Sequence, residues 1–227
     1  MREAAKTNLV RHSNFASLYL QGRVLDIGAG SSPVCPSAVI FEKKDGDAND
    51  IGKYFPNESF DTVHSSHCLE HMNDPHSALS QWWSLVKPGG FMIVVVPDEA
   101  LYEQGIWPSW FNPDHRSSFR LKKTTPLSAN SFDIGEMCAD LQDAEVISTT
   151  VHDHRLDRKL LLPHGVKPRR VRHPLKFVVS IVKRIASPQS PLSIKFNRWL
   201  VRRGHPFDQT KGPALAQIEV MIRKIKM

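Results

Sequence analysis

The chain has few cysteines and no long hydrophobic run. Only Cys35, Cys68 and Cys138 occur among its 227 residues, and they form no Cys-x-x-Cys pair of the kind found in zinc sites. Their odd number and uneven spacing exclude a disulfide framework and favour a reducing, cytoplasmic environment. No apolar stretch approaches the ~18 residues of a membrane-spanning helix, and the first residues lack the apolar core of a secretory signal.

Acidic residues are nearly missing from one segment. The chain carries a formal net charge of +7, with 30 Lys and Arg against 23 Asp and Glu. Residues 155–205 contain many of these bases but a single acid, Asp157, so the remainder is net acidic. The basic character therefore belongs to one part of the chain. We predict a core over 1–153, a basic helical insert over 154–210, and a final strand of the core within 211–227.

A short apolar strand followed by glycines is the most informative motif. Residues 24–27, Val-Leu-Asp-Ile, predict a buried strand. Gly28 and Gly30 allow a sharp turn and a close approach of the backbone to a ligand. A dinucleotide fingerprint would need a third glycine where Pro33 stands. Open parallel sheets bind ligands where their strands end, so this turn is a candidate site, although similar glycines also form turns without a function.

Three motifs resemble those of class I S-adenosylmethionine-dependent methyltransferases, specifically the methyltransferase-11-like members. Asp-x-Gly-x-Gly at 26–30 resembles the first motif of that family. Leu-Glu-His at 69–71 and Lys-Pro-Gly-Gly at 87–90, between a helix and an apolar strand, follow at the family's spacing. The resemblance is strong over residues 20–100. It implies an α/β, Rossmann-like sheet of seven strands, mostly parallel with an antiparallel last strand, and S-adenosyl-L-methionine as the cofactor.

The connection after the first strand departs from the usual pattern. The next strand candidate, 38–41, follows Gly30 after only seven residues, whereas a parallel crossover usually needs a dozen or more. We therefore predict a shortened first crossover that turns around Pro33 and Pro36. The remaining expected elements are helices over 3–20, 75–86 and 132–142, and strands over 60–66, 91–96, 144–152 and 216–223.

The resemblance assigns cofactor-binding roles to several residues. The backbone at Gly28 and Gly30 would pack against the methionine portion of the cofactor, with Asp26 beneath it. Glu42 would accept hydrogen bonds from both ribose hydroxyls, a role that suits an acceptor-only carboxylate; the alternative is a solvated acid. The other assigned residues are Asp47, for which Asp45 and Asp50 are rivals, then Ala48, Ser65 and His67.

An oxygen acceptor would benefit from a general base, and three residues are candidates: His71, Asp98 and His115. His71 could instead be a structural cap. His67 and His71 are four residues apart, as in some metal-binding pairs, but no third ligand is evident nearby in the sequence. We therefore predict no metal site.

The acceptor is inferred from two segments. Residues 101–115 place aromatic, acidic and amide side chains on an irregular segment, which suits carbohydrate contacts or a loop that buries its own aromatic rings. Asp114-His-Arg116 resembles a segment of methyltransferases from bacterial polysaccharide gene clusters. We predict an O-methyltransferase for a small-molecule, sugar or lipid-linked glycan acceptor, by family analogy. The alternatives are an RNA or protein methyltransferase, and a non-catalytic interaction module with the same fold.

Within the insert, apolar residues with cationic neighbours recur over 177–185 and 194–201. This pattern is typical of helices that lie on an anionic membrane surface. We therefore predict such contact through 166–203, at the inner face of a cell membrane; a lid on the sheet, a dimer contact and a solvated linker are the alternatives. Nucleic-acid binding is disfavoured because the segment contains no RNA-binding module. The oligomeric state is left open.

Overall fold

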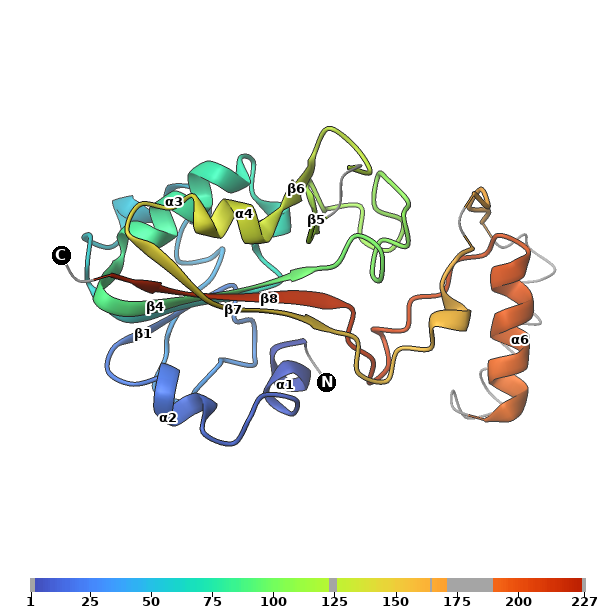
Figure 1. Cartoon of the computed structure of the whole chain (residues 1–227), viewed down its shortest axis with the longest axis horizontal. Coiled ribbons are helices and arrows are strands. Elements are labelled where there is room, and N and C mark those ends of the chain that lie inside the picture. Colours follow the sequence, from blue (N-terminus) through green and yellow to red (C-terminus); the bar gives the residue numbers. More distant parts are fainter. Residues whose placement is uncertain (1–2, 123–125, 164, 171–189, 226–227) are drawn as a thin grey trace.

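A six-stranded sheet forms the centre of the computed structural model (Figure 1), which describes residues 3–122, 126–163, 165–170 and 190–225. Its strand order is β2-β1-β3-β4-β8-β7. The first four strands are parallel, and β8 runs antiparallel to both β4 and β7. Their bounds are β1 Val24–Ile27, β2 Val39–Phe41, β3 Phe60–Ser66, β4 Val86–Pro97, β7 Ala144–His152 and β8 Gln217–Lys224.

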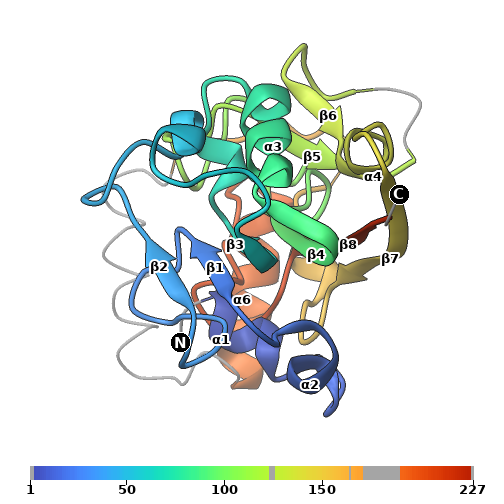
Figure 2. The ribbon, with the colours of Figure 1, turned by 90° about the vertical axis from the view of Figure 1, so that its left-hand side faces the viewer.

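Helices cover both faces of this sheet. In Figures 1 and 2, α3 (Pro75–Ser84) and α4 (Ile134–Ala139) lie on one face, and α1 (Glu3–Asn8) and α2 (Phe15–Tyr19) lie on the other. A small parallel sheet of β5 (Ser118–Arg120) and β6 (Ser131–Asp133) extends the α3 and α4 side. The short 3₁₀ helices are η1 Ala48–Lys53, η2 Leu69–His71 and η3 Arg158–Leu160.

The central strand β4 contributes to a hydrophobic core on each face of the sheet. Met92 and Val94 belong to a large cluster that also contains Trp82 of α3, whereas Ile93 packs with Phe15 on the other face. Successive side chains of a strand point to opposite faces. This explains why the apolar run at 91–96 does not alternate with polar residues, as expected for a strand buried on both sides.

A local cap fixes the start of helix α3, and contacts with β3 fix the start of the strand that follows it. Asp74 caps the helix, because its carboxylate accepts hydrogen bonds from the amides of His76 and Ser77. The Lys-Pro-Gly-Gly segment packs tightly against Asp61 at the start of β3. A Cβ on Gly90 would lie 2.6 Å from the Asp61 carbonyl oxygen, and Lys87 forms an ion pair with the Asp61 carboxylate at 2.9 Å.

The fold class and the shortened first crossover are confirmed, but the number of strands predicted from the sequence was wrong. Strands β1 and β2 pair in parallel without a helix between them. The main sheet has six strands and not seven. The chain between Glu42 and Ser59 forms turns and η1 and then returns directly to β3, so no strand among the described residues pairs with the outer edge of β2.

The single helix predicted over 3–20 was also wrong. The helix is interrupted between α1 and α2. The apolar side chains of Leu9 and Leu18, which a single buried helix would cover, are 74% and 55% exposed. The break lets Arg11 turn under the sheet, where it forms a buried ion pair with Glu219 of β8. A pattern of neighbouring residues does not reveal a contact between positions so far apart in the chain.

The chain between β7 and β8 leaves the sheet. Helix α6 (Pro191–Arg202) lies beyond the ends of these strands (Figure 1), and Arg198 of α6 forms an ion pair with Asp157 at 2.8 Å. The helix predicted at 194–201 is therefore present, whereas the one predicted at 177–185 lies outside the described residues. The boundaries at 153/154 and 210/211 stay a prediction. None of the described helices is both long and apolar enough to cross a bilayer.

The ion pair beneath the sheet predicts an acid-dependent loss of stability. Burial alone would raise the pKa of Glu219, but His152 and the Arg11 guanidinium lower it from 4.5 to about 2. This carboxylate therefore stabilises the fold above about pH 4.5, and its contribution, on the order of 3 kcal/mol, is lost as the pH falls towards 2.

We expect Glu219→Gln to lower the free energy of unfolding measured by urea denaturation at pH 6, and the difference from wild type to shrink steadily between pH 5 and pH 2. Glu145→Gln, at an exposed position of β7, controls for the removal of one carboxylate. A difference that stays constant over this pH range would contradict the assignment.

Candidate functional site

A large cavity opens where the parallel strands end. Its volume is about 910 Å³, within the roughly 300–1,000 Å³ typical of small-molecule sites. A smaller cavity of about 300 Å³ lies on the other side of the glycine turn, and Gly28 and His67 line both. The side chains and backbone that line the large cavity, called the main cavity below, include Phe41, Glu42, Lys43, Gly46, Asp47, Ala48, Asn49, Cys68, His71, Asn73, Asp114 and Arg116.

The turn after β1 has no room for a side chain at Gly28. Its φ is +75°, in the left-handed region that favours glycine. A Cβ there would lie 2.9 Å from the Cβ of Cys68, closer than such atoms approach. The backbone therefore passes directly against the segment that follows β3, and this contact forms the floor between the two cavities.

Asp26 is held below this turn. It is 1% exposed, one carboxylate oxygen accepts a hydrogen bond from the Val34 amide at 2.6 Å, and the other lies 2.7 Å from Nδ1 of His64. Asp26 lines the smaller cavity, and its predicted place beneath a ligand agrees with this geometry. Its hydrogen bonds fix the loop that replaces the first crossover helix.

Glu42, at the end of β2, is half-buried and lines the main cavity. The amide of Gly30 donates a hydrogen bond to its carboxylate, which joins the ends of β1 and β2. A carboxylate has two oxygens and about four lone-pair sites. Glu42 therefore retains the capacity to accept hydrogen bonds from hydroxyls of a ligand in the cavity.

Asp47 and Ala48 lie together on the wall of the main cavity. Asp47 caps η1, and the hydrogen bonds that it accepts from Asn49, above all from the backbone amide, lower its pKa. The Ala48 carbonyl accepts a hydrogen bond from the indole of Trp82, which anchors this wall to α3. The preceding Gly46 is crowded, because a Cβ there would lie 2.3 Å from Cζ of Tyr54.

Three residues predicted from the sequence line neither cavity: Ser65 and Asp98, and His115, which is described with His71 below. Ser65 is buried, and its hydroxyl donates to the Ile27 carbonyl at 3.3 Å. Asp98 is 7% exposed and caps the turn after β4 by accepting from the amides of Ala100 and Leu101. The geometry gives both residues supporting positions, since neither lines the cavities in which ligand contact was expected.

His67 lies between the cavities in an uncommon backbone conformation. Its φ is +56°, a region that few non-glycine residues occupy and that often marks functional segments. Its Nε2 lies 3.0 Å from Oε1 of Gln217 on β8, and its Nδ1 lies 3.5 Å from Oε1 of Glu70. These contacts orient the ring, and His67 lines both cavities; its contact with a cofactor stays a prediction.

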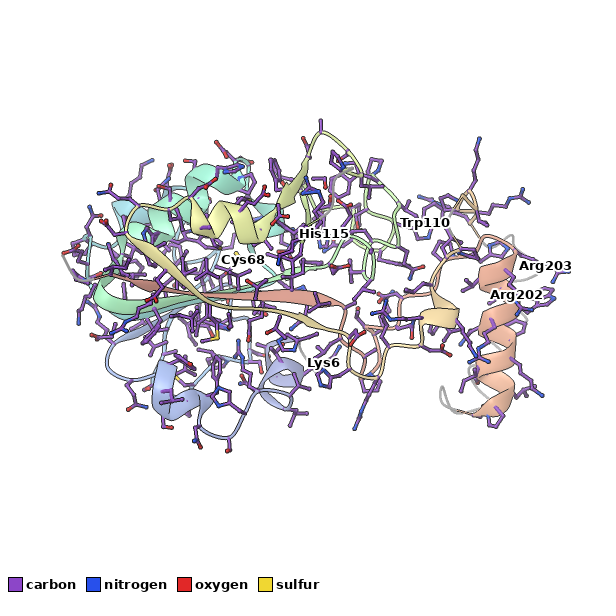
Figure 3. The ribbon with its side chains drawn as sticks, in the orientation of Figure 1. Lys6, Cys68, Trp110, His115, Arg202 and Arg203 are labelled. Carbon is purple, nitrogen blue, oxygen red and sulfur yellow. The ribbon has the colours of Figure 1, made fainter. Side chains whose placement is uncertain are left out.

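The other two predicted histidines, His71 and His115, lie side by side next to the main cavity. The rings of His71 and His115 are 5.0 Å apart. His71 lines the cavity, whereas His115 is buried among acids, with Nδ1 2.7 Å from Glu103 and Nε2 3.9 Å from Glu70. Figure 3 places His115 on the same side of the sheet as Cys68 and opposite Lys6.

Sequence reasoning missed the two buried glutamates of this group. Glu70 is 1% exposed and Glu103 is fully buried. Burial alone would raise the pKa of Glu70, but His67, His115 and His71 lower it below its ordinary value. Glu70 lies inside the Leu-Glu-His motif and was available as a signal, whereas Glu103 reaches His115 only through the path of the folded loop.

Comparison with known proteins identifies the family and the fold. The profile of a methyltransferase domain family matches residues 1–125. Among curated protein sequences none matches the chain significantly. Solved structures of similar shape include a SAM-dependent methyltransferase from Archaeoglobus fulgidus, with 16% identity, TM-score 0.50, and coverage of 99% of this chain and 95% of that one.

Two further structures are similar. The YcgJ protein from Bacillus subtilis has 13% identity and TM-score 0.51 over the full length of both chains. Phosphoethanolamine N-methyltransferase 2 from Haemonchus contortus, in complex with S-adenosyl-L-methionine, has 15% identity and TM-score 0.50 over 97% of this chain and 52% of that one. At these identities the likeness shows the fold alone.

The glycine turn predicts a position-specific loss of stability. Gly28→Ala places a methyl group against Cys68 and also forces alanine into a left-handed conformation. Gly105→Ala is the matched control, because its φ is +70° but a Cβ there meets nothing within 4 Å. We expect the control to lose about 1–2 kcal/mol of unfolding free energy and Gly28→Ala to lose clearly more in urea denaturation. Equal losses would show that the contact with Cys68 is unimportant.

Proposed function

The chain belongs to the methyltransferase domain family, and we propose that the acceptor of its S-adenosylmethionine-dependent methyl transfer is an oxygen atom of a small molecule, a sugar or a lipid-linked glycan. The single observation behind this site is the meeting of the Gly28 turn and the Glu42 carboxylate at the rim of the main cavity.

The residues present fit the cofactor. The turn at Gly28 and Gly30 offers backbone without a Cβ, and Glu42 offers an acceptor-only group for the ribose hydroxyls. Asp47 and Ala48 lie on the same wall, where they would contact the adenine. The sulfonium of the cofactor supplies an electrophilic methyl group, so the main task of the protein is to align the acceptor with it.

Of the three candidate bases, His71 is the one that lines the main cavity. Its Nδ1 lies 3.1 Å from the carbonyl oxygen of Asp114. A carbonyl can only accept a hydrogen bond, so Nδ1 carries the proton and Nε2 has a lone pair. His71 is thus oriented to take a proton from an acceptor hydroxyl in the cavity, and His115 lies behind it.

The loop after β4 supports a polar acceptor. Its residues Pro113, Asp114 and Arg116 form part of the rim of the main cavity. The same loop contacts the basic insert, because the Gln104 side chain accepts from the Leu162 amide and donates to the Phe207 carbonyl. A cavity of about 420 Å³ lies between loop and insert. An extended acceptor such as a glycan chain could contact both surfaces.

The role of Glu42 predicts a loss of cofactor affinity on substitution. Glu42→Ala removes the acceptor for the ribose hydroxyls, and the loss of charge-assisted hydrogen bonds costs about 1–3 kcal/mol, or roughly 5- to 150-fold in Kd. Isothermal titration with S-adenosylmethionine measures this change. Glu145→Ala, on an exposed face of β7, should bind as wild type does. Unchanged affinity in Glu42→Ala would contradict the ribose assignment.

We further propose that the insert contacts an anionic membrane surface, where a lipid-linked acceptor would be found. The exposed residues of α6 recur at helical spacing and combine apolar and cationic side chains: Leu192, Lys195, Trp199 and Arg202. Arg203 follows and stacks on Trp199 at 4.0 Å from the ring. Apolar residues flanked by cations on one face favour the interface of an anionic bilayer.

The membrane proposal is tested by co-sedimentation with phosphatidylglycerol vesicles, with phosphatidylcholine vesicles as the neutral comparison. Each cation near an anionic surface contributes about 1 kcal/mol, so Arg202→Gln/Arg203→Gln should weaken binding at least roughly tenfold. Lys44→Gln/Lys53→Gln removes the same charge from exposed positions in the segment between β2 and β3 and should have little effect. Binding that is equal in both double variants would reject contact through α6.

A further inference from the structure

Three side chains from two distant segments bring potential metal-ligand atoms together. One oxygen of Glu70 and one nitrogen each of His71 and His115 all lie within 4.8 Å of one another. Glu70 and His71 belong to η2, and His115 belongs to the loop after β4. The two segments are joined by backbone, because the amides of Arg116 and Ser117 both donate to the Glu70 carbonyl, at 2.8 and 3.2 Å.

The Glu70 carboxylate lies among groups that do not satisfy it. It is 1% exposed, and neither of its oxygens accepts a hydrogen bond from the residues that the structure describes. The ring nitrogens recorded near it are Nδ1 of His67 at 3.5 Å and Nε2 of His115 at 3.9 Å. A buried carboxylate without hydrogen bonds is costly, so a cation between Glu70 and the two histidines would stabilise the arrangement.

The histidines are held as metal-binding histidines usually are. Nδ1 of His115 contacts the fully buried Glu103 at 2.7 Å, and the other oxygen of Glu103 accepts from the Ser109 hydroxyl at 2.6 Å. Nδ1 of His71 contacts the Asp114 carbonyl. A carboxylate or carbonyl bound to one ring nitrogen fixes the tautomer and leaves the other nitrogen with a lone pair for a metal.

For His115 the consequence is specific. With the proton on Nδ1 and directed at Glu103, the lone pair of Nε2 faces the oxygen of Glu70 at 3.9 Å. Two electron-rich atoms oppose each other there unless a proton or a metal ion lies between them. The arrangement of two buried glutamates around one histidine thus calls for positive charge at this point.

We propose that Glu70, His71 and His115 form a binding site for a divalent transition-metal ion, with Zn²⁺ as the ion that the ligand set suits. Two imidazoles and one carboxylate make a three-ligand site with further positions open for water or substrate. Ligands at about 2.0–2.2 Å from one tetrahedral ion lie about 3.3–3.6 Å apart. The three ligand atoms, which lie within 4.8 Å of one another, therefore have to approach by up to about 1.5 Å when the ion binds. His71 lines the main cavity, so the site adjoins it.

This metal site goes beyond the proposed function, but its use in catalysis rests on the proposed methyl transfer. An ion at this wall would bind the acceptor oxygen and lower the pKa of its hydroxyl. The ion would then take over the activation that His71 alone would supply as a base. Metal binding itself depends only on the three ligands and is measured without turnover.

The full chain is stripped with a chelator, dialysed, and titrated with Zn²⁺ by calorimetry, with the metal content measured by mass spectrometry. We expect one ion per chain and a rise in Tm with Zn²⁺, because an ion that binds only the folded state stabilises it. Glu70→Gln and His71→Gln should each weaken binding roughly tenfold or more. His76→Gln, at an exposed position of α3, controls for zinc held by other histidines and should bind as wild type does.

Cobalt substitution of the wild type gives a second readout that needs no variant to fold. Co²⁺ bound by two nitrogens and one oxygen should give visible absorption bands that Zn²⁺ displaces. Absence of a stoichiometric ion, or zinc binding that Glu70→Gln and His71→Gln leave unchanged, overturns the proposal. S-adenosylmethionine binding, titrated in the same metal-free protein, separates this failure from failure of the proposed function.

Discussion

A buried network of polar side chains on one face of the sheet connects the strands that build the site. Asp26 on β1 contacts His64 on β3 at 2.7 Å, the Arg11 guanidinium lies 3.3 Å from the other nitrogen of His64, and Arg11 pairs with Glu219 on β8. Each member is nearly inaccessible to water, so each depends on the next for its hydrogen bonds. This network fixes the end of β1 relative to β3 and β8, and it thereby fixes the position of the Gly28 turn.

The two faces of the sheet have different tasks as a result. Beneath it, Arg11 occupies a break in the N-terminal helix and compensates the charge of Glu219. Above it, η2 and the loop after β4 enclose Glu70, His71 and His115 around a carboxylate without hydrogen bonds. The lower network is internally satisfied and serves stability. The upper cluster is not, and buried polar groups that remain unsatisfied are the places where a ligand is expected.

The family likeness and the cavity address different questions. The matched domain covers residues 1–125, which contain the glycine turn, Glu42 and the histidine cluster but neither β7, β8 nor the insert. Cofactor use thus rests on the part of the chain that the family shares. Many unrelated reactions use the same fold, so the likeness does not identify the acceptor, which we propose contacts the loop after β4 and the segment between β7 and β8. The contact between Gln104 and the insert joins these two segments.

The sequence alone determined the strands, the glycine turn and the Asp74 cap, because strand burial, turn conformation and helix capping depend on residues close together in the chain. It also determined the compressed first crossover, since seven residues cannot form a helix and return. The six-stranded rather than seven-stranded sheet, the break at Arg11 and the meeting of Glu70 with His115 were decided only by the tertiary structure. Each depends on contacts between distant segments, and no local pattern specifies which buried charge a folded chain will bring to another.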